Sequence, residues 1–141
     1  MNPWLAHVVE LARGLTVSRA TSPKAYKAII ARQLEADGWY VRARFLVPSR
    51  GCDDHYRGAL DLVCWPPPFP DPRGPEHAPN PHISNRPPPI LIDLDKCSVG
   101  RKTRAKLASF AYPCSGRVVI LTQADDSPPC QGIDTIVCLG A

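Results

Sequence analysis

Two strongly apolar stretches of the sequence are interrupted by aspartates. Asp61 lies within residues 58–65, and Asp93 and Asp95 lie within residues 90–96. In an extended chain alternate side chains share a face, so Asp93 and Asp95 should point the same way. Neighbouring carboxylates on a buried strand repel each other unless a cation or protons neutralise them. If the two strands are neighbours, the three carboxylates predict a site for Mg²⁺ or Mn²⁺, which prefer oxygen ligands.

Positively charged residues follow these aspartates. Lys96 should face away from them in a regular strand, unless a β-bulge after Asp95 turns it inward. Ser98 is expected to cap a helix over residues 101–111, with Leu107, Phe110 and Ala111 on its buried side. The expected contacts to a nucleic-acid backbone are Arg101, Lys102, Arg104 and Lys106, of which Lys102 and Lys106 lie one turn apart on the more exposed side.

The elements that must position these residues follow from periodicity and from start and stop signals. Asn2-Pro3 and Ser22-Pro23 predict the starts of two helices, which end near Gly14 and Gly38. The second helix carries Lys24, Lys27 and Arg32 on its polar face, for which solvation is the simpler interpretation and phosphate contact the alternative.

Alternating patterns then predict strands over 39–47 and 58–65, joined as a hairpin, and later strands over 90–96, 117–122 and 134–139. In the first strand, the odd-numbered residues from Trp39 to Val47 are expected to share one face. The helix between strands 90–96 and 117–122 implies that these two strands are parallel. The sequence therefore predicts an α/β protein in which helices pack against a mixed sheet.

Length and composition predict one domain. The 141 residues suit a single core over 1–141, with the proline-rich stretch 66–89 as a loop insertion, because proline removes the backbone donor that a helix or an inner strand needs.

A net charge of +4 weakly favours polyanionic partners. No apolar run reaches the roughly 18 residues that span a membrane, and no secretory signal is seen, so a cytoplasmic protein without membrane contact is expected.

The six cysteines allow an alternative function. Most fit the role of small buried hydrophobic residues in a reduced protein. A zinc-stabilised interaction module would instead need several ligands to converge, although the sequence has no Cys-x-x-Cys pair. Those ligands would be Cys52, His55, Cys64 and either His77 or His82.

Over residues 22–122 the chain resembles the PD-(D/E)XK nuclease superfamily. The resemblance rests on Gly58-Ala59-Leu60-Asp61-Leu62-Val63, which looks like the strand bearing the first acid of the family, and on Ile90-Leu91-Ile92-Asp93-Leu94-Asp95, which looks like the strand bearing its (D/E)-x-K element. It implies a restriction-endonuclease-like core of helix, hairpin, strand, helix and strand, here with an extra N-terminal helix. It also implies that Asp61 and Asp93 bind Mg²⁺ or Mn²⁺.

The departure from the family lies at Asp95, where lysine is usual. The resemblance allows Asp95 to be a third ligand or a water-orienting group, and it allows Lys102 or Lys106 to take the role of the lysine. It implies a metal-dependent endonuclease that hydrolyses phosphodiester bonds in DNA, with a homodimer or a partner subunit needed to cut both strands. The alternative within the fold is a catalytically inactive module that binds DNA or a protein partner. A purely structural alternative has Asp61 paired with Arg42, Arg44 or Arg57.

Overall fold

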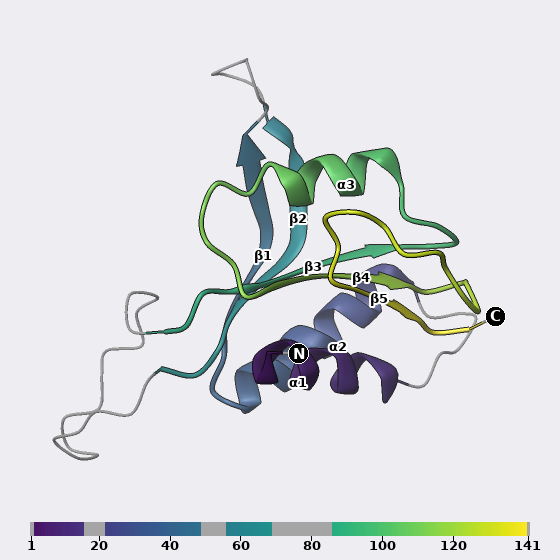
Figure 1. Ribbon diagram of the computed structural model, residues 1–141. Helices are drawn as coiled ribbons and strands as arrows, with labels where there is room; N and C mark the ends of the chain where they lie inside the picture. The colour runs from purple at the N-terminus through teal and green to yellow at the C-terminus, as the bar shows by residue number, and fades with distance from the viewer. Residues whose placement is uncertain (1, 16–21, 49–55, 69–85, 141) are drawn as a thin grey trace, which may run out of the picture.

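The computed structural model of the chain describes residues 2–15, 22–48, 56–68 and 86–140. Within them, five strands form one mixed sheet in the order β1-β2-β3-β4-β5, with α1 and α2 on one face and α3 on the other (Figure 1). This confirms the expected α/β class. The elements are α1 Pro3–Arg13, α2 Pro23–Ala36, β1 Tyr40–Pro48, β2 Tyr56–Trp65, β3 Ile90–Asp95, α3 Arg101–Ala108, β4 Gly116–Leu121 and β5 Thr135–Cys138.

Both N-terminal helices begin as predicted. Asn2 Oδ1 accepts hydrogen bonds from the backbone N–H groups of Trp4 at 2.8 Å and Leu5 at 3.4 Å. Ser22 Oγ accepts one from Ala25 N at 3.3 Å. Each cap satisfies a backbone donor that the first helical turn leaves free, and a proline follows directly where its missing N–H does no harm.

The order of the sheet places β3 in its centre. β2 pairs with β1 and β3 in the antiparallel sense, whereas β4 is parallel to β3 and β5 is parallel to β4. The predicted hairpin and the predicted parallel pair are both confirmed. Ile90 and Ile92 pack in the hydrophobic cluster that faces α1 and α2, whereas Leu91 packs in the cluster under α3, so β3 alternates as its sequence pattern indicates.

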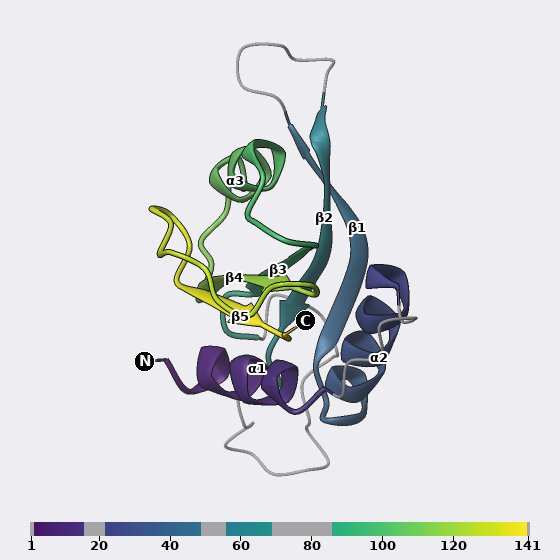
Figure 2. The same cartoon turned by 90° about the vertical axis from the view of Figure 1, so that its right-hand side faces the viewer.

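The prediction that β1 keeps one buried face is wrong. Trp39 and Val41 pack on the side of α1 and α2, but Phe45 and Val47 pack on the side of α3. Between them Arg44 has φ of 56°, in the left-handed region, and this breaks the two-residue alternation. The outer half of the hairpin thereby stands beside α3 (Figure 2).

The predicted helix over 101–111 is too long, and Ser98 does not cap it. The N-cap position of α3 is Gly100, which has no side-chain cap, and the Gly100 N–H instead donates to Asp95 Oδ2 at 3.0 Å. The helix ends at Ala108, next to a carbonyl of Leu107 that accepts a hydrogen bond from Arg117 Nε at 3.1 Å. The chain then leaves the helical path, so Ala111, expected to be buried, is exposed.

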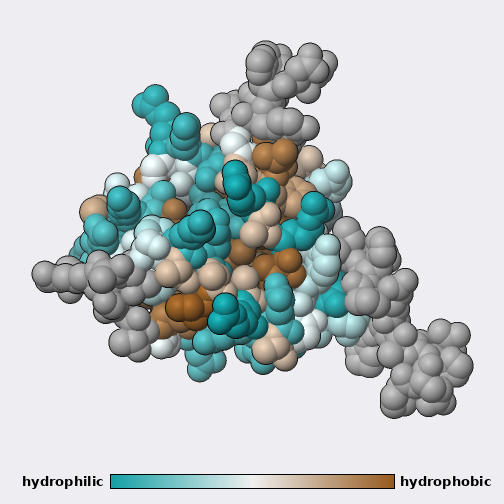
Figure 3. Space-filling model, turned by 180° about the vertical axis from the view of Figure 1, so that it is seen from behind, coloured by the Kyte–Doolittle hydropathy of each residue, from teal (hydrophilic) through white to brown (hydrophobic). Residues whose placement is uncertain are grey.

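The face seen in Figure 3 mixes hydrophilic residues with small hydrophobic patches. Residues 69–85 of the proline-rich stretch lie outside the described residues, and its described ends, 66–68 and 86–89, form neither helix nor strand. Within the described ranges no helix is long and apolar enough to cross a membrane. The large hydrophobic side chains that the described residues expose are Ile29, Tyr40, Leu46 and Tyr112.

Candidate metal and phosphate site

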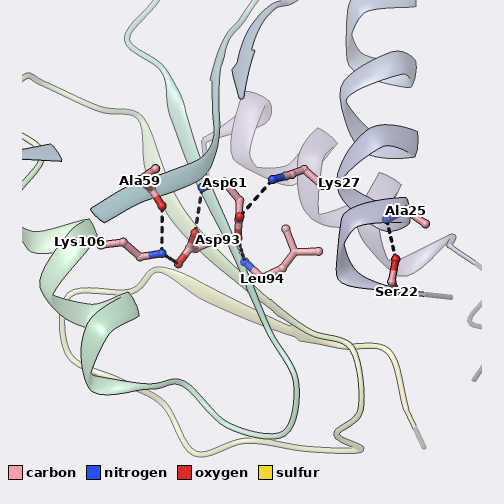
Figure 4. A network of polar contacts seen from close by, with 8 residues as sticks. All are labelled: Ser22, Ala25, Lys27, Ala59, Asp61, Asp93, Leu94 and Lys106. Carbon is pink, nitrogen blue, oxygen red and sulfur yellow. Dashed lines mark hydrogen bonds and ion pairs between the residues drawn. The ribbon is translucent and has the colours of Figure 1, made fainter. Parts of the chain in front are cut away.

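β2 and β3 separate where the two aspartates stand. Their ladder pairs Leu62 with Ile92 and stops there, one residue before Asp61 and Asp93 would face each other. Asp93 Oδ1 accepts a hydrogen bond from the Asp61 N–H at 3.0 Å, and Asp61 Oδ2 accepts one from the Leu94 N–H at 2.8 Å (Figure 4). The carboxylates thus take up backbone donors that the diverging strands no longer pair, and the structure brings Asp61 and Asp93 together.

Lys106 reaches this acid pair from α3. Its Nζ lies 2.8 Å from Asp93 Oδ2 and donates to the Ala59 carbonyl at 3.1 Å (Figure 4). Its stem passes close to Gly58, which has φ of 137° and where a Cβ would come within 3.3 Å of Lys106 Cδ. Lys106 therefore points inward, and its expected place on the exposed side of the helix is wrong.

Lys27 of α2 supplies a second cation that sequence reasoning did not assign to the site. Its Nζ lies 3.5 Å from Asp61 Oδ1. The only signal for it in the sequence is its place on the polar face of an amphipathic helix. Among the described side chains, the cation that contacts Asp61 is this lysine, and neither Arg42 nor Arg44 of the structural alternative does so. The Arg57 side chain lies outside the described residues.

The two aspartates differ in burial and hence in electrostatics. The Asp93 side chain is 1% exposed and that of Asp61 is 27% exposed. The pKa of Asp93 is raised to about 7, chiefly by burial and next by the neighbouring Asp61 carboxyl, while the contact with Lys106 lowers it in part. Asp93 is therefore an acid that changes its charge near neutral pH, in contact with a lysine.

The remaining predicted site residues do not join the acid pair. Asp95 is half-buried, and its Oδ2 is engaged by the Gly100 N–H. Lys96 is exposed beyond the end of β3. No group of three or more Asp, Glu, His or Cys side chains in the described part of the chain is placed to hold a metal ion. Arg101, Lys102 and Arg104 are exposed on α3.

Two carboxylates nevertheless fit Mg²⁺ or Mn²⁺. Magnesium is commonly held by one or two carboxylates and keeps several of its waters. Asp93 Oδ2 is buried and, apart from its ionic contact with Lys106, has no hydrogen-bond partner among the described residues. A carboxylate oxygen has more than one lone pair, so the contact with Lys106 leaves room for a second partner. Asp61 and Asp93 are therefore the residues that could hold a divalent ion.

The zinc alternative loses one of its ligands. Cys64 is buried in the hydrophobic cluster under α1 and α2, and burial, with a smaller effect of Glu35, raises the pKa of its thiol far above the ordinary value. Zinc binds the thiolate, which this environment disfavours. The other ligands of that alternative, Cys52, His55, His77 and His82, lie outside the described residues.

Comparison with known proteins adds no relative. No family model, curated protein or solved structure matches the chain.

Proposed function

We propose that the protein is a divalent-metal-dependent endonuclease of the restriction-endonuclease-like fold that hydrolyses phosphodiester bonds in DNA. The observation that carries the proposal is the meeting of Asp61, Asp93 and Lys106 where β2 and β3 separate. Two acids and one lysine are the parts that the resemblance to PD-(D/E)XK nucleases leads us to expect. Here the lysine comes from α3, and Asp95 stands in its usual place.

Asp61 and Asp93 would hold Mg²⁺ or Mn²⁺. When bound, such an ion lowers the pKa of a coordinated water and neutralises charge that develops on the phosphate. Lys27 and Lys106 together balance the two carboxylates in the metal-free protein. Lys27 makes the longer and more exposed of the two contacts. Its ammonium is therefore the one that a bound metal ion would displace.

Lys106 would contact the scissile phosphate. An ammonium has three N–H donors, and the contacts with Asp93 and the Ala59 carbonyl use two of them. The third donor is available for a phosphate oxygen. Because these contacts fix the ammonium before substrate arrives, little reorganisation is needed as charge develops on the phosphate. Exposed Arg101, Lys102 and Arg104 of the same helix would hold the backbone on either side.

The test is nicking of supercoiled plasmid with Mg²⁺ or Mn²⁺, with EDTA as the blank. We expect the parent to nick and Asp93→Asn or Lys106→Met to lose about 100-fold or more in rate. Arg13→Gln is the control, since it removes an exposed cation of α1 to which the proposal gives no role. The proposal fails if supercoiled, linear and single-stranded DNA all stay intact, or if Asp93→Asn cuts as fast as the parent.

A non-cleaving module of the same fold is the second candidate, and a specific observation favours it. The acid pair is already neutralised by two lysines, so the folded protein does not require a metal ion at this place. This function predicts salt-sensitive DNA binding, or binding of a protein partner, that is unchanged by EDTA. It also predicts that Mg²⁺ leaves the unfolding temperature unchanged.

A further inference from the structure

Five aromatic rings form a continuous row at the end of the sheet where β3 begins. Successive ring centroids, from Tyr40 through Trp65, Phe45 and Phe110 to Tyr112, are 5.6, 6.3, 5.7 and 5.7 Å apart. Trp65 and Phe110 are buried, whereas Tyr112 is 67% exposed and Tyr40 is 39% exposed. An aromatic side chain as exposed as Tyr112 contributes little to the core, so the outer end of the row presents a ring to solvent.

This row borders a pocket of about 390 Å³. The volume lies within the range of roughly 300–1,000 Å³ that small-ligand pockets occupy. Prolines 87–89 and Pro113 form part of its wall, which makes it rigid and gives it few hydrogen-bond donors. The other lining residues are Arg42, Phe45, Trp65, Arg86, Phe110 and Tyr112.

Both charged residues among the described lining of the pocket are arginines. The Arg42 guanidinium lies 5.3 Å from the centroid of the Phe45 ring. Arg86 Nη1 donates to the carbonyls of Gly38 at 2.8 Å and Pro66 at 3.1 Å, which holds the guanidinium in place, while its Nε is buried with no partner among the described residues. None of the described residues that line the pocket is acidic. The pocket therefore suits a flat aromatic group that carries negative charge.

We propose that this pocket binds an unpaired nucleotide of a single-stranded DNA segment, with its base against the exposed aromatic end and its phosphate beside the arginines. Stacking on aromatic side chains and contacts with arginine are the two interactions by which proteins hold single strands. In a duplex the faces of the bases are covered by their neighbours, so the pocket selects unpaired positions. A proline-rich peptide could also use an aromatic groove, but it gives no role to two arginines that have no acidic partner among the described residues.

The pocket and the acid pair both lie on the α3 side of the sheet. Phe110 follows Lys106 by four residues, and Pro89 precedes Asp93 by four residues, a distance of about 13 Å along β3. That the bound strand is also the one cut rests on the proposed nuclease function. The proposal that the pocket binds an unpaired nucleotide does not depend on the nuclease function.

The test measures binding of fluorescein-labelled oligothymidylate to the full chain by fluorescence anisotropy in EDTA, where no cleavage can occur. We expect single-stranded oligothymidylate to bind more tightly than a duplex of equal length. Tyr112→Ala should weaken binding at least fivefold, which is the lower end of the stacking contribution of one base. Arg42→Gln should weaken it about threefold and should reduce the slope of log affinity against log salt by about 0.7.

The controls are Arg13→Gln and Ile29→Ala, which change exposed residues on α1 and α2 and should leave binding unchanged. Tyr112 and Arg42 are exposed, so their variants are expected to fold. Equal affinity for single strand and duplex, or a Tyr112→Ala variant that binds like the parent, would overturn the inference. So would tighter binding of a proline-rich peptide that Tyr112→Ala abolishes. Retained single-strand binding by a protein that cuts no DNA would support the pocket and refute the nuclease.

Discussion

Replacement of Asp93 by asparagine should stabilise the metal-free protein at alkaline pH. Asparagine keeps the oxygen that accepts from the Asp61 N–H and removes a charge from a side chain that is 1% exposed. The pKa of Asp93 is raised from its ordinary value of 3.8 to about 7, chiefly by burial. Between those two pH values the folded protein holds a proton that the unfolded chain has released. The stability due to this proton is fully present below the unfolded pKa and is lost as pH rises through the folded pKa.

The size of the effect follows from the two pKa values. Each pKa unit corresponds to about 1.4 kcal/mol, so this one carboxyl should lower the free energy of unfolding by roughly 2–3 kcal/mol between about pH 5 and about pH 8. Asp93→Asn lacks this titration. The new amide also faces Lys106 Nζ and replaces an ion pair, which offsets part of the stabilisation. We therefore expect a net stabilisation of about 1–2 kcal/mol at pH 8.

Urea denaturation followed by circular dichroism, in EDTA at both pH values, measures the difference between the parent and Asp93→Asn. Asp126→Asn is the control, because it removes an exposed aspartate. The expected result is a variant that gains stability relative to the parent as pH rises from about 5 to about 8, while the control does not. A difference that is the same at both pH values would refute the assignment of a raised pKa to Asp93. A variant less stable than the parent at pH 8 would show that the ion pair with Lys106 outweighs the burial of the carboxylate.

Three further predictions concern metal affinity and packing. Lys27→Gln should bind Mg²⁺ up to about fivefold more tightly in calorimetry, because it removes a partly exposed cation that competes at Asp61; unchanged or weaker binding would contradict this. Gly116→Ala should lower the free energy of unfolding by about 1–3 kcal/mol in urea titrations, because its Cβ would stand 2.9 Å from Leu5 Cδ1; a neutral effect would mean that Leu5 can move aside. Asn2→Ala should cost about 1 kcal/mol in the same assay through loss of the α1 cap, and no loss would show that this cap is not needed.

The proximity of Asp61 and Asp93 could be predicted from the sequence. Both stand in apolar strands, and a hairpin followed by a third strand makes β2 and β3 neighbours. Alternation along β3 also predicted correctly that Leu91 lies on the opposite face of the strand from Ile90 and Ile92. Periodicity does not show at which residue two paired strands separate. The ladder ends at Leu62 and Ile92, and this makes the carboxylates hydrogen-bond acceptors for the backbone.

The roles of the lysines were not predictable in the same way. Lys102 and Lys106 lie on one stripe of a helical wheel, but only the second turn of α3 comes close to Asp93. Helical spacing gives the side of a helix and not the angle at which it crosses a sheet. Lys27 shows the same limit, since a cation on an amphipathic helix usually faces water. The aromatic pocket could not be predicted from the sequence either, because its walls come from four segments of the chain.

The change of face at Arg44 has a consequence for how the protein unfolds. Because β1 and β2 give residues to the hydrophobic clusters on both sides of the sheet, neither cluster can lose its packing without loosening the hairpin that serves the other. Amide protons in the centres of β2 and β3 should therefore exchange with solvent only through global opening. The acid pair, which depends on where these strands part, should then keep its arrangement until the whole domain unfolds.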